Sequence, residues 1–335
     1  MATSALTGRR LTRLRLARPL WYPALLILVL LVVGLFASDP PTLYLITLMG
    51  VYGVAALGLN VMFGMAGMMS LVQAGAMAVG AYVSALAVVK AGVPFLVALL
   101  LGVLLAAALS AFASLVAMRV ATHYFVLVSL ALAETVTLFL VNQVDLTGGD
   151  NGLAGIPSLT IGGFSLSDPW PLAVTTIVLL FIAWYVADAF RASRVGYASV
   201  ASSSDPQIAM ACGVSIRRAR LIAGTVGGAF AGVAGALFAQ ALQFLGPSDF
   251  GLDKALLFLL IVVIGGLGSN AGTVVAAVVL TYLAEGFLQL QAVGPLVYGL
   301  GIMVILVLVP NGFTGLVRRL RRLVGPSART ESADV

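Results

Sequence analysis

Residues for metal binding and nucleophilic chemistry are scarce in this sequence. It contains one cysteine and one histidine in 335 residues, which excludes a Cys/His metal cluster and an internal disulfide. No Ser-His-Asp or Cys-His grouping occurs at a plausible common depth. We therefore predict no catalytic residue, no metal site and no enzymatic activity for this chain.

Charged side chains are also few. They make up 9% of the sequence, against about 25% in ordinary soluble domains, and hydrophobic residues make up 61%. So few charges cannot build the polar shell of a soluble protein, and lipid must cover much of the surface. The net charge of +6 comes from arginines clustered between apolar runs. This is the pattern of cytoplasmic loops in a membrane protein, and we expect no nucleic-acid partner.

Ten apolar runs are candidates for membrane-spanning helices, because a bilayer core about 30 Å thick needs roughly 17 to 25 mostly apolar residues per helix. They predict an all-α, polytopic membrane helix bundle with about ten transmembrane helices, in the range of eight to ten because the eighth run is short. The runs cover residues 20–36, 43–62, 68–89, 94–118, 124–141, 171–188, 221–240, 255–267, 272–290 and 295–309.

The arginine clusters orient this bundle. With ten spans, the clusters at residues 9–18, 191–220 and 318–322 share one side, which the positive-inside rule makes cytoplasmic. The N- and C-termini are then both cytoplasmic, and Lys90 lies on the opposite side from the arginine clusters. We divide the chain into a basic cytoplasmic segment 1–19, one transmembrane domain 20–316 and a basic cytoplasmic tail 317–335. The domain includes an outer loop at 142–168 and a cytoplasmic loop at 189–220.

Four polar residues within the predicted spans are candidates for a transport path: Asn60, Gln73, Glu134 and Glu285. A carboxylate in mid-span costs about 2.5–3.5 kcal/mol on insertion scales, so Glu134 must face the bundle or water. It could belong to a translocation path or a proton site. It could equally be satisfied by hydrogen bonds between helices, and the sequence leaves both interpretations open.

Two glycine-rich stretches resemble phosphate-binding loops without their context. GGLGSNAG at 265–272 joins two predicted spans instead of a strand and a helix, so we do not expect it to bind a nucleotide. LTGGDNGLAGIP at 146–157 lies in the predicted outer loop, where its glycines and asparagine permit tight turns. We expect it to shape the outer mouth, the alternative being a plain connector.

The cytoplasmic loop 189–220 predicts a short helix. Ser204 or Asp205 can cap its start with Pro206 in the first turn, and Gly213 can end it. Such a helix could dock into a cytosolic partner, or could lie on the membrane surface and simply join two spans.

Several stretches, in the right order along the chain, resemble the inner-membrane permeases of ATP-binding-cassette importers for branched-chain amino acids, of the LivM type. They are LGLNVMFGMAGMMSLVQAGAMAVGAY at 57–82, YFVLVSLALAE at 124–134, the glycine-rich stretch at 146–157, IVVIGGLGSNAGTVVAA at 261–277 and PNGFTGL at 310–316. In the family's coupling-helix motif, Ala209 and Gly213 agree, while Gln207 replaces the usual Glu and Ile208 the first Ala.

The resemblance implies a division of labour. The chain would be a multi-pass protein of the bacterial plasma (inner) membrane that forms the translocation path with a second, related permease subunit. Two cytosolic ATP-binding subunits would carry ATP and Mg, so that this chain holds no cofactor. An extracytoplasmic binding protein would deliver substrate and dock on the glycine-rich outer stretch, at Thr147, Gly148, Gly149, Asn151 and Gly152. Coupling to the ATPases would use residues of the short cytoplasmic helix: Asp205, Pro206, Gln207, Ile208, Ala209 and Gly213.

Two other functions stay open at this stage. An ion-coupled secondary transporter would use Glu134 or Glu285 as an intramembrane proton site, and a membrane scaffold would transport nothing. The substrate is also open, since related permeases serve urea, short amides and other amino acids.

Overall fold

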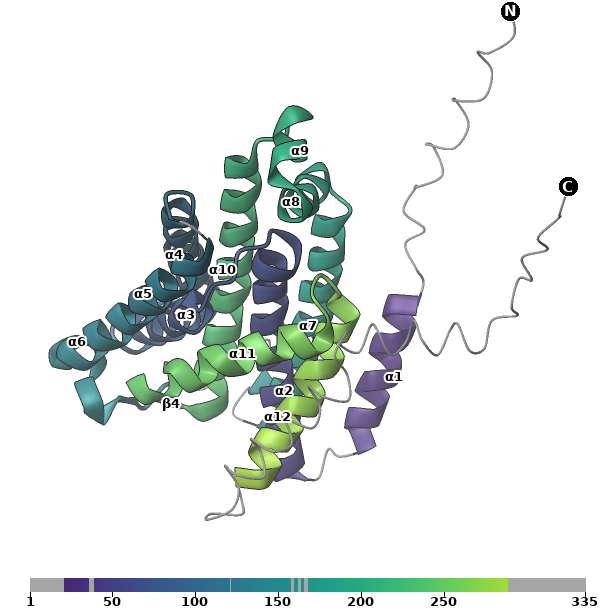
Figure 1. The fold of residues 1–335 in the computed structure, drawn as a ribbon. Helices are drawn as coiled ribbons and strands as arrows, with labels where there is room; N and C mark the ends of the chain where they lie inside the picture. Colours follow the sequence, from purple (N-terminus) through teal and green to yellow (C-terminus); the bar gives the residue numbers. More distant parts are fainter. Residues whose placement is uncertain are drawn as a thin grey trace, which may run out of the picture.

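The computed structural model describes residues 21–35, 39–120, 122–157, 160–161, 164–165 and 168–288, and nearly all of them are helical (Figure 1). The long helices are α1 (Trp21–Leu35), α2 (Pro40–Leu59), α3 (Val72–Val89), α4 (Phe95–Ala117), α5 (Thr122–Asn142), α7 (Pro169–Arg191), α10 (Ile216–Leu242), α11 (Leu252–Gly265) and α12 (Asn270–Leu288). A π-helix, η1 (Asn60–Met65), continues α2.

Short elements form the connections. The loop after α5 holds α6 (Val144–Thr147), a 3-10 turn η2 (Gly149–Asn151) and the two-residue strands β1 (Leu153–Ala154), β2 (Thr160–Ile161) and β3 (Phe164–Ser165). The loop after α7 holds α8 (Arg194–Ser204) and α9 (Pro206–Ala211), and the loop after α10 holds β4 (Phe244–Leu245) and η3 (Pro247–Phe250). Strand β1 pairs antiparallel with β4, and β2 with β3.

The sequence explains where several helices begin. Proline occupies the first turn of α2, α7 and α9, and an aspartate precedes each of these helices. Proline suits this position because the first turn of a helix needs no backbone N–H donor, and because the proline ring already holds φ near its helical value.

The connecting segments gather at two ends of the bundle. We name as the basic end the segments 66–71, 118–120, 192–215 and 266–269, and as the acidic end the segments 90–94, 143–157 and 243–251. Arg191 and Gly268 meet at the basic end. At the acidic end Lys90 Nζ donates to the carbonyl oxygen of Asp145, at 2.5 Å. Lys90, the residue that broke the predicted charge pattern, therefore has a local role there.

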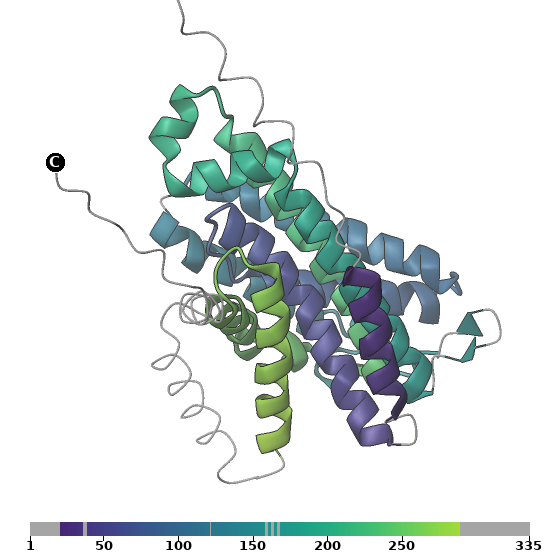
Figure 2. The same ribbon diagram turned by 90° about the vertical axis from the view of Figure 1, so that its right-hand side faces the viewer.

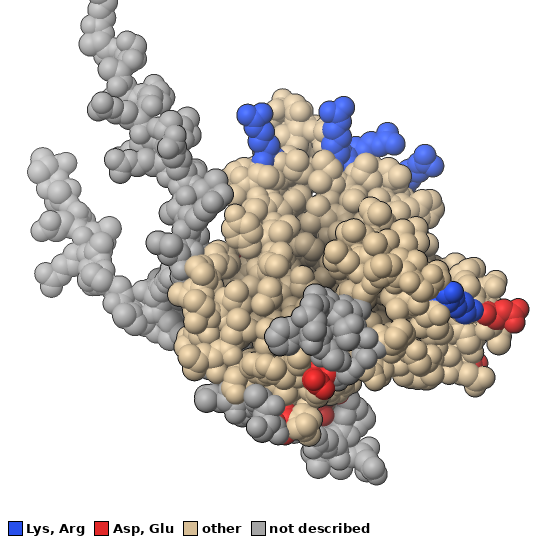
Figure 3. Space-filling view, turned by 180° about the vertical axis from the view of Figure 1, so that it is seen from behind, with Lys and Arg blue, Asp and Glu red and all other residues tan. Residues whose placement is uncertain are grey.

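The two ends differ in charge and in form. In the space-filling view most Lys and Arg side chains project from one end, and the Asp and Glu side chains lie toward the other (Figure 3). Helices α8 and α9 extend beyond the end of α2 at the basic end (Figures 1 and 2). Helix α11 runs at a steep angle to α2 and α12 (Figures 1 and 2).

The core lies around α2, α3 and α10. In the most apolar 18-residue stretch of each helix, the buried share is 83% for α2 with η1 and 67% for both α3 and α10. The corresponding share is 28% for α4 and 22% for α5. Glycines bring the central helices together, and a Cβ on Gly80 of α3 would lie 2.5 Å from the Cα of Gly232 on α10. Small residues of this kind let helix backbones approach closely in a membrane, where no hydrophobic effect drives helices together.

The prediction of a polytopic, helical membrane protein is confirmed. Helices occupy nine of the ten predicted ranges, and six of them are long and apolar enough to cross a membrane. Helix α11 has 14 residues, and the apolar stretches of α1 and α12, Tyr22–Leu31 and Asn270–Glu285, are shorter than those of the six. The predicted span 295–309 and the segments 1–19 and 317–335 lie outside the described residues. The count of ten and the cytoplasmic termini therefore stay predictions, as do the domain bounds.

Candidate functional site

The loop predicted to couple with a partner forms two helices, α8 and α9, at the basic end. Asp205 caps α9, because its Oδ1 accepts hydrogen bonds from the backbone N–H groups of Gln207, at 2.9 Å, and Ile208, at 3.0 Å. Pro206 occupies the first turn, and Gly213 follows the helix with φ +78°. The predicted helix is therefore present with the predicted cap, and α8 is an additional element.

The side chains of α9 divide into one buried residue and several exposed ones. Ala209 is 4% exposed, whereas Ile208 is 63% and Met210 is 56% exposed. Two large apolar side chains on a six-residue helix at the tip of the loop form a small unpartnered apolar surface. Such exposed apolar groups mark interaction sites when polar or charged residues surround them.

The loop is fixed to the bundle near η1. Gly67, just after η1, has φ +68°, and a Cβ there would lie 2.9 Å from Oγ of Ser203 on α8. Ser193 begins α8 by accepting a hydrogen bond from the N–H of Gly196, at 3.1 Å. A displacement of α8 and α9 would therefore act directly on the π-helical end of α2.

Asn60 lies within a polar network at this same end of α2. Its side chain is fully buried, donates to Oδ1 of Asn270 at 2.8 Å and accepts from the N–H of Gly268 at 2.9 Å. Asn270 in turn donates to Oδ1 of Asp188, at 2.7 Å. Arg191, one turn after Asp188, donates to the carbonyl oxygen of Gly268. The network thus joins η1, α7 and the α11–α12 connection.

Sequence reasoning missed Asp188 and Asn270. Tyr22 on α1 also donates a hydrogen bond to Asp188, so that this carboxylate links three helices. The sequence held one signal for Asn270, which belongs to the GGLGSNAG stretch at 265–272. That stretch is not a phosphate loop. This stretch forms the tight α11–α12 connection, in which Gly266 has φ +97°.

Gln73 lies at the contact of three helices. Its side chain is 1% exposed, and its amide nitrogen donates to the carbonyl oxygens of Ala55 on α2, at 2.8 Å, and Gly227 on α10, at 3.2 Å. Its Oε1 has no hydrogen-bond partner among the described residues. These hydrogen bonds indicate that Gln73 helps to hold α2, α3 and α10 together. Its Oε1 remains able to accept a hydrogen bond.

The two carboxylates predicted in mid-span lie on different helices. Glu134 on α5 is half-buried, beside Ala133, which packs on α3 against Gly75. It forms no hydrogen bond or ion pair within the described part of the chain. Glu285, near the end of α12, is also half-buried and lies within electrostatic range of Lys254. The roles of both carboxylates on a path stay predictions.

Lys254 was missed by the sequence interpretation. Its Nζ donates to the hydroxyl of Tyr52 at 2.6 Å and lies 4.7 Å from the centroid of that ring. Asp249 and Glu285 both interact with it electrostatically. Lys254 therefore lies against a buried aromatic ring toward the acidic end of α2, with carboxylates within electrostatic range but without an ion pair among the described residues.

The glycine-rich stretch at 146–157 is a constrained structure. Thr147 is 1% exposed, and its hydroxyl donates to the carbonyl oxygen of Leu140 at 2.6 Å. Gly148, Gly149 and Gly152 all have positive φ, of +83°, +59° and +71°. Asn151 and the neighbouring Asp150 are exposed.

Strand pairing fixes this stretch to the segment that follows α10. Leu153 of β1 pairs with Leu245 of β4, whose carbonyl oxygen also accepts from the hydroxyl of Tyr82, at 3.0 Å. A Cβ on Gly152 would lie 2.5 Å from that oxygen. The prediction of tight turns is confirmed, and the role in docking is untested.

The predicted path residues are only partly brought together. Asn60 and Gln73 both lie near the last turn of α2. Asn60 begins η1, which continues α2, and the amide of Gln73 on α3 lies against Gly58. Within the described residues, no hydrogen bond joins Glu134 or Glu285 to that turn.

Comparison with known proteins decides the family. A family model described as the permease component of branched-chain amino acid transport systems matches residues 42–309. The chain belongs to this permease family. It is 30% identical to the high-affinity branched-chain amino acid transport system permease protein LivM of Escherichia coli, over 92% of this chain and 78% of that protein.

Other relatives of this permease include the LivH proteins. The high-affinity LivH permease of Salmonella typhimurium is 28% identical, over 81% of this chain and 93% of its own length. A probable LivH permease of Methanocaldococcus jannaschii is 30% identical over 45% of this chain and 50% of that protein. No solved structure matches. The predicted identity as a LivM-type, multi-pass permease of the inner membrane is therefore confirmed.

Proposed function

We propose that this chain is the permease subunit of an ATP-binding-cassette importer, and that it forms a path for branched-chain or related amino acids by alternating access. The observation that carries this proposal is α9, a capped helix with exposed Ile208 and Met210 at the basic end. A helix of this kind fits a cleft in a cytosolic ATP-binding subunit, which would supply ATP and Mg. The positive-inside rule supports a cytoplasmic position for this end.

Movement of the ATPases would reach the bundle through the base of the loop. Helix α8 touches the chain just after η1 at Gly67, and η1 carries Asn60, which holds Gly268 and Asn270. A shift of α9 would therefore displace the last turn of α2 and the α11–α12 connection together. Shared rigid elements of this kind are how coupling travels between distant sites.

The acidic end would face the extracytoplasmic binding protein. The stretch 146–157 presents exposed Asp150 and Asn151 on a backbone that strand pairing holds in place, which suits docking of a folded partner. Nearby, Lys254 and Glu285 provide the opposite charges that a zwitterionic amino acid requires on entry. We assign Asn60, Gln73, Glu134 and Glu285 to the path in this proposal, together with a second, related permease subunit.

Reconstitution tests the proposal. The full-length chain is assembled in proteoliposomes with the related permease and the two ATP-binding subunits, and radiolabelled leucine is added with the binding protein outside. Uptake should require ATP inside and the binding protein outside. Uptake that persists without ATP would refute the importer assignment, as would ATP hydrolysis that never responds to loaded binding protein.

The same preparation tests the ion-coupled alternative. Dissipation of the proton gradient with an ionophore, at constant ATP, should leave uptake unchanged. Collapse of uptake under this treatment would favour a secondary transporter that uses Glu134 or Glu285. A scaffold would show neither uptake nor substrate-dependent hydrolysis.

A further inference from the structure

A groove with a volume of about 540 Å³ opens at the basic end, where the end of α4 meets α9 and the start of α10. Three arginines line it, one just after α4 and two on the first turns of α10, together with apolar side chains. The arginines are Arg119, Arg217 and Arg220, and the apolar residues that matter here are Leu115, Met118 and Met210. The groove shares Met210 with the exposed surface of α9 and is distinct from the Asn60 network.

No residue that the structure describes neutralises the positive charges in this groove. None of the three arginine side chains forms a hydrogen bond or ion pair with any residue that the structure describes. The Nε atom of Arg220 is buried and lacks a partner among those residues. A buried charged donor without a partner is costly, because it has lost its water and gained no acceptor in exchange. An anionic ligand with several acceptor oxygens, such as a phosphate group, would satisfy all three arginines.

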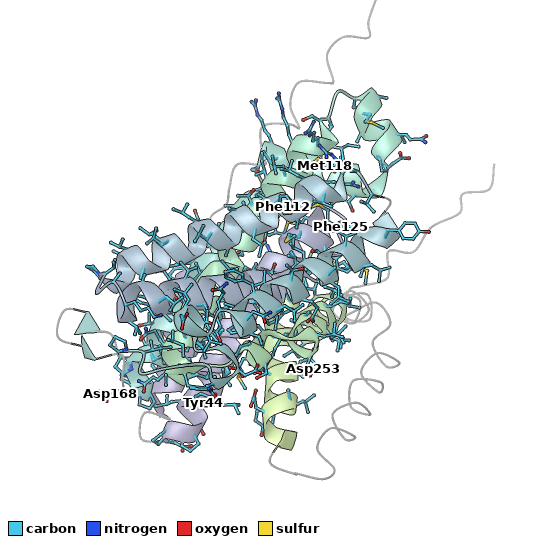
Figure 4. The ribbon with its side chains drawn as sticks, turned by 90° about the vertical axis from the view of Figure 1, so that its left-hand side faces the viewer. Tyr44, Phe112, Met118, Phe125, Asp168 and Asp253 are labelled. Atoms are coloured by element: carbon cyan, nitrogen blue, oxygen red, sulfur yellow. The ribbon has the colours of Figure 1, made fainter. Side chains whose placement is uncertain are left out.

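The apolar wall of the groove continues onto the outer face of α4. Leu101, Leu104, Phe112 and Leu115 recur at helical spacing and are 43%, 65%, 55% and 39% exposed, so they form an apolar stripe along a membrane-spanning helix. Figure 4 places Phe112 and Met118 along this helix, with Met118 nearer the end that bears α9. The stripe therefore leads from the bilayer directly to the arginines.

We propose that this groove binds the phosphate headgroup of an anionic glycerophospholipid, whose acyl chains lie along the exposed stripe of α4. A lipid supplies both parts that the site requires, an anion at the bilayer surface and long apolar chains beside it. Basic pockets between helices at the cytoplasmic surface suit anionic headgroups. The proposal takes its cytoplasmic orientation from the proposed function, but lipid binding does not require transport to occur.

Native mass spectrometry of the full-length chain tests the site. The chain is purified in mild detergent with the subunits that co-purify, and phosphatidylglycerol or phosphatidylcholine is added. Phosphatidylglycerol should be retained selectively. The double variant R119Q/R220Q should bind it about 30-fold more weakly, as expected for the loss of two basic residues near an anionic headgroup. The control R194Q/R218Q removes the same charge from exposed arginines at the same end that do not line the groove, and should bind like the wild type.

Two further measurements separate the possible results. Thermal melting without added lipid establishes that both double variants fold. Inorganic phosphate and glycerol 3-phosphate are then added as competitors, and neither should displace phosphatidylglycerol at millimolar concentration. Full displacement would assign the groove to a soluble anion and overturn the lipid assignment. Equal retention by the two double variants, or equal retention of phosphatidylcholine, would also overturn it. Because these readouts involve no uptake, failure here leaves the importer function testable by itself.

Discussion

Substitution of Gly152 by alanine tests whether the glycine-rich outer stretch must keep its observed conformation. Gly152 has φ 71° and ψ 179°, a region that essentially only glycine adopts. A Cβ there would lie 2.5 Å from the carbonyl oxygen of Leu245 and 2.8 Å from the ring of Phe244. Gly155 provides a matched control, because it has φ +75° and nothing within 4 Å of an added Cβ.

The two substitutions share a positive φ and differ in the space that an added Cβ would have. Both place alanine at positive φ, which costs about 1–3 kcal/mol. At Gly152 the added carbon falls about 0.9 Å inside the 3.4 Å of ordinary contact, and the β1–β4 pair must separate to admit it. Overpacking of this kind typically adds about 1–3 kcal/mol. Gly152→Ala should therefore destabilise the β1–β4 pairing by an additional ~1–3 kcal/mol, the overpacking cost, relative to Gly155→Ala.

The assay compares uptake and assembly of both variants in the reconstituted transporter. We expect Gly152→Ala to melt at a lower temperature and to lose most leucine uptake while still co-purifying with the ATP-binding subunits, whose predicted contact lies at the opposite end. Gly155→Ala should keep most of its uptake. Equal uptake and equal melting temperatures for the two variants would refute the reasoning, since the close approach to Leu245 would then carry no consequence.

Three further predictions follow from other parts of the chain. Asp205→Ala removes the cap of α9 at a cost of about 1 kcal/mol and should reduce co-purification of the ATP-binding subunits, whereas Asp205→Asn, which keeps an acceptor oxygen, should not. Glu134→Gln should leave ATP-driven uptake within about twofold of the wild type, because glutamine keeps a polar side chain on the path and an ATP-driven mechanism needs no proton site there; loss of uptake with normal folding would contradict this. Gly80→Ala should lower thermal stability in detergent by about 1–3 kcal/mol, since its Cβ would meet the backbone of α10. Gly34→Ala, with its nearest atom at 3.7 Å, should be neutral.

The helices and the capped helix α9 could be predicted because their signals are local. Apolar runs of bilayer length indicate the helices, and the sequence Asp205-Pro206 indicates the start of α9 through its cap and first turn. The positive φ angles of Gly148, Gly149 and Gly152 were likewise expected from a turn-rich composition.

The long-range contacts could not be predicted in this way. Asp188 and Asn270 are separated by 82 positions in the sequence, and nothing in either local pattern indicates that they meet. The same holds for the pairing of Leu153 with Leu245 and for the contact of Lys254 with Tyr52. Burial also depends on neighbours, so hydropathy alone could not separate the central α2 from the peripheral α5.

Helix α10 connects the two proposed docking regions. It runs without interruption for 27 residues, about 40 Å at 1.5 Å per residue, from the coupling loop to β4. Because β4 pairs with β1, a displacement of α9 at the basic end would reach the glycine-rich stretch at the acidic end through one rigid element. The glycines of α10 pack on the backbones of α3 and α4 with few long side chains between them, as at Gly232 against Val103. Such flat contacts allow a helix to slide or rotate without the repacking of large side chains, and a rigid α10 moving in this way would open one end of the bundle as it closes the other.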